Sequence, residues 1–204
     1  MSRGPDLRLL LAQGRHALSS GRVVEIADLV EADPRRARRL IEFMFDDDPG
    51  VAQRAADVLE RISHQPSPAL GRILAESKEV FLGLLPEATL KKVRWNLALT
   101  MGRLPLTSPE ARRVAAILEA WLDDPSSILK TAALQGLADM AHREPALRPT
   151  VLDLLRLHGR SGTPAMRARS RRLLAAFWVE PSRDDPATPT SSQARLPKWE
   201  VGPE

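Results

Sequence analysis

The sequence of 204 residues predicts an all-α fold, a right-handed α-solenoid of about four two-helix repeats preceded by an N-terminal helical hairpin. Six times before residue 179 a capping residue directly precedes proline, which is typical of a helix start: the side chain accepts first-turn N–H bonds, and proline has no N–H to satisfy there. Pro49, Pro86, Pro125 and Pro164 follow at intervals of 37, 39 and 39 residues, a period typical of stacked helix pairs. Apolar residues recur at helical spacing, and no alternating stretch indicates a strand.

The segments between these markers predict the helices in order. Residues 1–33 are expected to form the N-terminal hairpin, with helices at 6–19 and 22–32, and residues 34–178 the repeat domain. The predicted helix pairs are 34–45 with 49–63, 68–85 with 87–103, 109–122 with 126–142, and 147–158 with 164–178. The pairs that predict helix starts are Asp33-Pro34, Asp48-Pro49, Ser67-Pro68, Ser108-Pro109, Asp124-Pro125 and Thr163-Pro164.

The second helix of each pair is predicted to lie between neighbouring repeats, because its apolar residues cover more than one face. The third repeat shows this best, with Ile128, Ala132, Ala133, Leu134, Leu137 and Met140. Small residues such as Ala98 and Gly136 permit close approach between helices within the stack.

The character of the chain changes after Trp178. Residues 179–204 contain five prolines separated by Ser, Thr and Asp, so they are predicted to form a flexible tail. Two alternatives remain for its segment 196–199: a short docking motif, or Trp199 folding back onto the open end of the solenoid.

Composition excludes several classes of protein. No apolar run approaches the about 18 residues of a membrane span, and residues 9–11 are too short an apolar stretch for a signal peptide. We therefore expect a cytoplasmic protein without a membrane partner. The absence of cysteine excludes disulfides, thiol catalysis and cysteine-based zinc sites.

The formal net charge is +4, and 25 of the 30 basic residues are arginine. This bias has two interpretations. Arginine suits phosphate or carboxylate recognition because its planar group binds both in a fork. A GC-rich genome, which the abundance of Ala, Arg, Gly and Pro also indicates, explains the same bias, and a charge of +4 is modest for a dedicated nucleic-acid binder.

Three segments carry a family resemblance. They run from Asp48-Pro49-Gly50-Val51 to Ile62, from Val93-Arg94-Trp95 to Leu104, and from Asp124-Pro125 through Leu134 to Met140. Each resembles the second helix of a HEAT repeat. Over about residues 34–178 the chain is similar to a group of bacterial HEAT-repeat proteins of undefined biochemical role. The resemblance implies the fold and says almost nothing about activity.

The resemblance also implies a ladder of charges between repeats, formed by an aspartate in the loop and a basic residue early in the second helix. Asp48 and Asp124 match the acidic positions. Arg94, Lys130 and Arg167 match the basic positions, whereas Ala52 departs from the pattern. A structural role for these charges is therefore expected.

No motif predicts catalysis, a cofactor or a metal site. His16, His64, His142 and His158 are scattered without ligand spacing. There is no phosphate-binding loop and no nucleophile elbow. The acidic runs at 46–48 and 123–124 lie at helix starts, where capping already explains them. The prediction is a protein that is not an enzyme, with no cofactor.

Two clusters of basic residues have open roles, as partner contacts or as solvated surface. One, at Arg35, Arg36, Arg38 and Arg39, opens a helix, where positive charge opposes the helix dipole. The other comprises Arg167, Arg169, Arg171 and Arg172 on the outward side of the last helix.

Trp95 lies off the core stripe of its helix, about 140° from Leu90 at about 100° per residue. It either packs against the adjacent layer, together with Leu99, or forms an exposed binding hot spot. The predicted partner-contact residues on the inner surface, which the second helices form, are Gln53, Arg54, Asp57, Lys91, Lys92, Trp95 and Arg169.

The function predicted from these observations is a non-enzymatic scaffold whose inner surface binds a protein partner. The alternative is a DNA-binding protein of HEAT-like fold, with base-lesion chemistry of the alkylpurine glycosylase type as a further option. Such enzymes have a similar architecture, but the aromatic and acidic residues near Trp121 fit them only loosely. The sequence predicts neither the partner's identity nor an oligomeric state.

Overall fold

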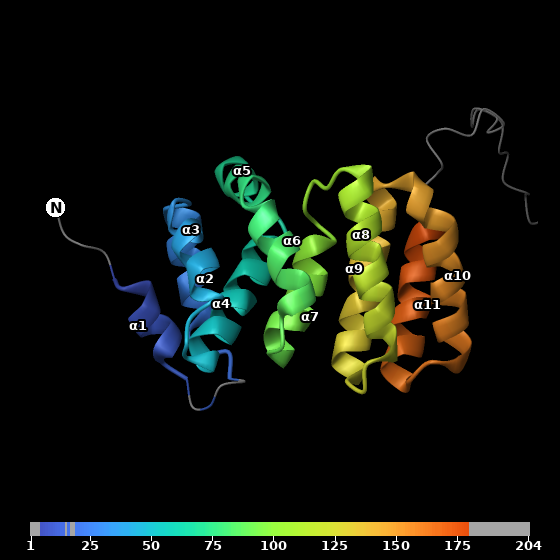
Figure 1. The fold of residues 1–204 in the computed structure, drawn as a ribbon, viewed down its shortest axis with the longest axis horizontal. Coiled ribbons are helices and arrows are strands. Elements are labelled where there is room, and N and C mark those ends of the chain that lie inside the picture. Colours follow the sequence, from blue (N-terminus) through green and yellow to red (C-terminus); the bar gives the residue numbers. More distant parts are fainter. Residues whose placement is uncertain (1–4, 15, 17–18, 180–204) are drawn as a thin grey trace, which may run out of the picture.

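The computed structural model describes residues 5–14, 16 and 19–179, and within them the chain is entirely helical. Figure 1 shows the helices following one another along the long axis, which confirms the all-α repeat fold. The described helices are α1 (Leu7–Ala12), α2 (Val23–Ala32), α3 (Arg36–Phe43), α4 (Pro49–Ile62), α5 (Pro68–Glu76), α6 (Lys78–Glu87), α7 (Lys91–Met101), α8 (Ser108–Ala120), α9 (Ser127–Arg143), α10 (Arg148–Ser161) and α11 (Pro164–Val179). Val179, the first residue of the predicted tail 179–204, ends α11, and the rest of that segment, with Trp199, lies outside the described residues.

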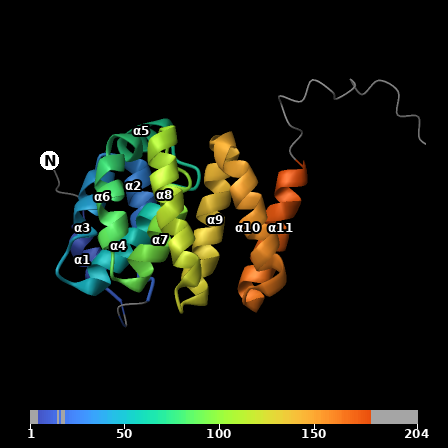
Figure 2. The same cartoon turned by 45° about the vertical axis from the view of Figure 1, so that its right-hand side comes forward.

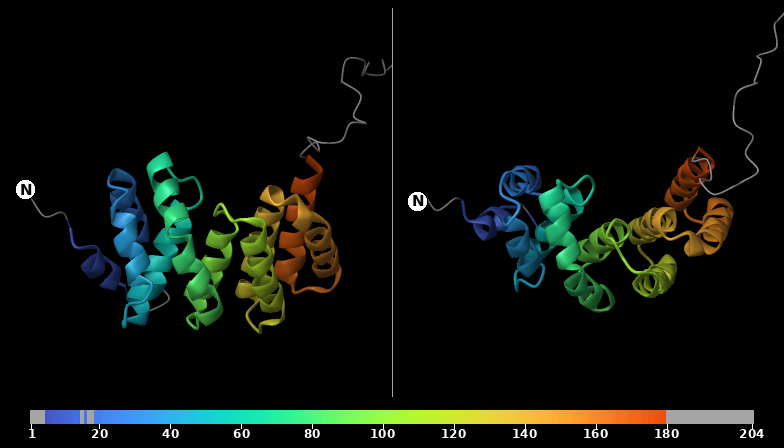
Figure 3. Two further views of the ribbon diagram at one scale, coloured as in Figure 1. Left: turned by 45° about the horizontal axis from the view of Figure 1, so that its top comes forward. Right: turned by 90° about the horizontal axis from the view of Figure 1, so that it is seen from above.

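The helices form two rows. The second helices α4, α7, α9 and α11 pack successively against one another, and α1 and α2 pack on α4 at the N-terminal end. The first helices α3, α6, α8 and α10 pack against this row, and α5 packs against α3 and α6; Figures 2 and 3 show the arrangement. One continuous hydrophobic core runs through the stack from α1 to α11. Among the described helices, none has the length and hydrophobicity that crossing a bilayer requires.

The first helix of the second repeat differs from the single helix predicted over 68–85. The chain breaks at Ser77, whose backbone leaves helical geometry with φ −92° and ψ 4°. The chain changes direction at this break, so that α5 packs on α3 while α6 packs on α7 and α8. Both short helices bury leucine side chains, including Leu74 of α5 and Leu85 of α6.

The helix predicted over 6–19 is also shorter, because α1 ends at Ala12. The chain beyond it approaches the buried side chain of Arg54: an added Cβ at Gly14 would lie 2.6 Å from the Arg54 Nη1. Gly21 supports the same tight path with a φ of 54°, a conformation that favours glycine.

The helix starts follow the predicted pairs in part. Asp48 caps α4 by accepting from the backbone N–H of Gly50, at 2.7 Å, and of Val51. Thr163 accepts from Met166 N–H at 3.3 Å. Ser108 and Asp124 do not cap as predicted: α8 starts one residue earlier, with a capping box from Thr107 to Glu110, and the cap of α9 is Ser126.

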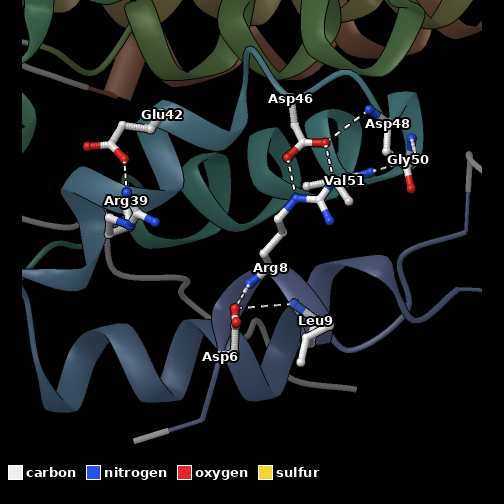
Figure 4. A network of polar contacts seen from close by, with 9 residues as sticks. All are labelled: Asp6, Arg8, Leu9, Arg39, Glu42, Asp46, Asp48, Gly50 and Val51. Carbon is white, nitrogen blue, oxygen red and sulfur yellow. Dashed lines mark hydrogen bonds and ion pairs between the residues drawn. The ribbon is translucent and has the colours of Figure 1, made fainter. Parts of the chain in front are cut away.

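The N-terminal helix is held to the stack by an exposed ion pair, shown in Figure 4. Arg8 of α1 donates from Nε and Nη2 to both oxygens of Asp46, at 2.7 and 2.9 Å. Asp46 also accepts from the backbone N–H of Asp48 at 2.9 Å. These donors lower the pKa of Asp46, Arg8 being the main cause. The α3–α4 loop thus docks α1 and starts α4 at the same place.

The closest packing joins α7 to α9. Gly102 lies so near α9 that an added Cβ would sit 2.7 Å from the carbonyl oxygen of Gly136. At Gly136 an added Cβ would collide with the carbonyl oxygen of Ala98 and lie 3.0 Å from Leu118. The obstacle at both positions is backbone, which has no rotamer with which to move aside.

Gly136→Ala is therefore expected to lower the free energy of unfolding by about 1–3 kcal/mol, the usual cost of overpacking. The loss should occur although alanine favours helix more than glycine does. The matched control is Gly83→Ala in α6, where an added Cβ meets nothing within 4 Å. The free energy of unfolding of that variant should rise by up to about 1 kcal/mol, because alanine has the higher helix propensity. Urea unfolding followed by circular dichroism checks both; stabilisation by Gly136→Ala would contradict the packing described.

Candidate functional site

Four of the predicted contact residues form internal polar contacts, three of them between α4 and α7 and the fourth between α4 and the N-terminal segment. The buried Lys92 ammonium pairs with Asp57, and Asp57 also accepts from the Asn96 side-chain amide at 2.7 Å. Gln53, also buried, accepts from the backbone N–H of Lys92 at 3.4 Å. Arg54 donates to the carbonyl oxygens of Leu11 and His16, the latter at 3.3 Å. The structure thus brings Gln53, Asp57 and Lys92 together and places Arg54 at the N-terminal cap.

The other three predicted contacts have more access to solvent. Lys91 is exposed at the start of α7. Trp95 and Arg169 are partly buried, Trp95 on α7 and Arg169 on α11, and both side chains line one depression in the protein surface. Trp95 packs against the core and also borders this depression, and its role in binding stays a prediction.

We call this depression and its continuation the inner groove. Its apolar part encloses about 330 Å³ between α7, α9 and α11. The apolar side chains that line it are Trp95, Leu99, Ile128, Ala132 and Ala165. Ile128 is 59% exposed, an unusual position for a large aliphatic side chain and one available to a ligand.

The charged part of the inner groove encloses about 520 Å³ and extends from α4 to α11. Leu99 and Arg169 line both the apolar and the charged part, so the two parts adjoin each other. The charged and amide side chains of this part are Glu60, Arg103, Gln135, Asp139, Arg143 and Arg169. His142 also lines it, with its ring stacked on Phe177 at 4.1 Å between ring centroids.

Arg103 pairs with both carboxylates of the groove. It donates to Glu60 Oε1 at 2.8 Å and lies 3.9 Å from Asp139 Oδ2. Asp139 also accepts from the Gln135 amide at 2.6 Å. Burial nevertheless raises the pKa of Asp139, because these partners offset only part of its lost hydration.

Arg169 has a different environment. It donates from Nη1 to the Gln135 side-chain oxygen at 2.6 Å, and its Nε is buried without a partner among the described residues. Burial, and then the nearby Arg172, lower the pKa of the Arg169 guanidinium. Arg169 is therefore a partly desolvated cation bonded to a neutral amide.

The two basic clusters have different surroundings. Each arginine of the first pairs with an acid: Arg35 and Arg36 with Asp33, Arg38 with Glu76, and Arg39 with Glu42. The arginines of the second cluster do not share one surface. Arg169 faces the inner groove, whereas Arg171 and Arg172 are exposed. The expectation that all four arginines of this helix face outward is thus wrong for Arg169, whose position faces α9.

The predicted charge ladder forms at one step. Arg94 donates to Asp124 at 2.8 Å and lies over the Trp121 ring, 4.8 Å from its centroid. The Ser126 backbone N–H and Arg94 lower the pKa of Asp124. Asp48 acts as a helix cap, and Arg167 donates to the Gly162 carbonyl oxygen at 2.9 Å, so these two do not extend the ladder. Within the described chain, no group of three or more His, Asp and Glu side chains is arranged to hold a metal ion.

Sequence reasoning missed the charged part of the inner groove. Glu60 comes from α4, Arg103 from the turn after α7, and Gln135 and Asp139 from α9, and only the packing of these segments brings them together. Ile128 was assigned to the broad apolar face of its helix, but the structure exposes it.

The raised pKa of Asp139 gives a pH prediction with a definite sign. The pKa of Asp139 is higher in the folded state than in the unfolded chain, so the unfolded chain ionises first as pH rises. The folded state therefore loses stability as pH rises from the unfolded pKa to the folded pKa. Asp139→Asn cannot ionise there, and its stability relative to wild type is expected to increase between about pH 3 and pH 7. The matched control is Asp153→Asn, an exposed carboxylate of α10. Urea midpoints at both pH values test this; an equal shift in the two variants would refute it.

Comparison with known proteins supports the architecture. No curated protein matches this sequence. A designed armadillo repeat protein in complex with the peptide (KR)4 is similar in structure, with a TM-score of 0.56 at 16% identity over 84% of this chain and 80% of that chain. An archaeal HEAT-like repeats protein from Thermococcus onnurineus NA1 gives a TM-score of 0.56 at 18% identity over 82% of this chain and 64% of that one. These likenesses concern the fold. The family model of HEAT repeats matches residues 37–138, half of the sequence, and the chain therefore belongs to the HEAT-repeat family.

Proposed function

We propose that this protein is a non-enzymatic interaction module that binds a protein partner in the inner groove. The observation that carries this proposal is the exposed Ile128 beside Trp95 and Arg169. A large apolar side chain, an aromatic ring and an arginine in one depression form the usual composition of a binding hot spot. The core explains the other large apolar side chains of α9, whereas it leaves Ile128 in solvent.

The form of the groove favours an extended segment over a compact domain. The groove crosses residues of α4, α7, α9 and α11 in one direction, so a ligand along it touches successive repeats. The similar designed armadillo repeat protein holds a peptide, (KR)4, which supports a peptide as the kind of ligand. Of the predicted contacts, Trp95 and Arg169 line the groove; we propose that Gln53, Asp57 and Lys92 act by fixing the α4–α7 joint beneath it.

A protein partner is favoured over DNA by the pairing of the arginines. All four members of the cluster at the start of α3 have acidic partners, which reduces their capacity to bind phosphate. Binding of a labelled DNA duplex measured at about 50 and 200 mM salt decides the question. We expect no binding at the lower salt. Binding that weakens about a thousandfold between these conditions would instead indicate several phosphate contacts and replace the present proposal.

The test of protein binding is capture on the immobilised chain from an extract of its own cells, quantified by mass spectrometry. Ile128→Ser removes an exposed side chain, so the fold should be retained while captured partners are lost. Leu157→Ser is the matched control, because Leu157 on α10 is 55% exposed and does not line the groove. Partners retained by Ile128→Ser as strongly as by wild type would exclude the inner groove as the binding site.

A further inference from the structure

We propose that the inner groove selects an extended peptide in which an aspartate or glutamate lies within two positions of a large apolar residue. Arg169 would bind the side-chain carboxylate, and the apolar side chain would lie against Trp95 and Ile128. This inference rests on the proposed function and specifies the chemistry of the partner.

The first argument compares Arg169 with other cations that face the preceding second helix. Two of these meet a carboxylate there. Lys92 pairs with Asp57, 35 residues earlier, and Arg103, in the turn after α7, pairs with Glu60, 43 residues earlier. Arg143 instead meets the carbonyl oxygen of Gly102, 41 residues earlier. Arg169 reaches back 34 residues in the same way, yet its partner there is Gln135, an amide. An amide accepts one hydrogen bond but cannot neutralise the cation. A partly buried guanidinium that makes no direct ion pair is costly. The nearby Asp139, which also faces Arg103, offsets only part of this cost, and an external carboxylate would reduce it further.

The second argument is the charge balance of the groove. Its two carboxylates, Glu60 and Asp139, both lie against Arg103. The remaining cations bond neutral oxygens: Arg143 donates to the Gly102 carbonyl at 3.2 Å, and Arg169 to the Gln135 amide. The unpaired charge in the described groove is therefore positive. An acidic segment complements it, whereas a basic segment would be repelled.

The third argument fixes the spacing within the peptide. Arg169 lines both the apolar and the charged part of the groove, so the carboxylate and the apolar side chain bind next to each other. In an extended chain, residues two positions apart project to the same side, about 6.5–7 Å from each other. A guanidinium binds a carboxylate through two parallel N–H···O bonds, which orients the peptide as well as attracting it.

The test is to select peptides that bind the full chain from a random library. The peptides are displayed without a free C-terminus, so that every carboxylate belongs to a side chain. Selected peptides are expected to pair Asp or Glu with Leu, Ile, Phe or Trp within two positions. Arg169→Gln should lose the acidic preference and keep the apolar one, while Arg169→Lys, which retains the charge, should keep both. Arg171→Gln is the matched control, since Arg171 is exposed on the same helix outside the groove.

A selected peptide synthesised with glutamine in place of its acid should bind wild type about tenfold more weakly, as a charged hydrogen bond is lost. The same replacement should have no effect on Arg169→Gln. Selected peptides without acid, or an acidic preference that persists in Arg169→Gln, overturn this inference and leave the proposed function standing. If no peptide is enriched, or if Ile128→Ser enriches the same peptides equally, both fail.

Discussion

The close approach of α7 and α9 is the constraint on which the rest of the structure depends. Gly102 and Gly136 leave these helices in backbone contact, with the Ala98 carbonyl against Gly136. This separation sets how far Trp95 on α7 lies from Ile128 on α9, and hence the width of the apolar part of the inner groove. A single helix pair could not bury its own apolar faces, so stability comes from successive pairs that share one core. Packing at this joint therefore determines both stability and binding geometry.

Cations that face a preceding repeat have two kinds of partner. Arg54 and Arg143 meet backbone carbonyl oxygens, whereas Lys92 meets the carboxylate of Asp57. Such pairs contribute less to net stability than to alignment, because desolvation cancels much of their attraction. Arg169 departs from both patterns, because it faces the side-chain amide of Gln135. The departure lies where the surface is hollowed, which is where an uncompensated charge has access to a ligand.

The repeat architecture followed from the sequence because it is encoded locally, by caps, prolines and helical periodicity. Asp48 illustrates this, since the cap and the proline after it begin α4 as predicted. The break at Ser77 was not predictable, because it results from the positions of α3 and α8 rather than from residues nearby. The site was predictable only in part. Trp95 was identified from its angle on the helix, whereas the pairing of Gln135 with Arg169 depends on the register between α9 and α11.

The inner groove has a mechanical consequence. Its lining joins Glu60 of α4 to Arg169 of α11, helices that are separated in the row by α7 and α9. A stack linked only through neighbouring repeats behaves as a spring, since small rotations at each joint add up along its length. A bound segment would act as a strut across several of these joints and stiffen the coil. Tension applied to the two ends would, conversely, spread the joints and release the segment, so occupancy of the groove and force on the molecule are coupled.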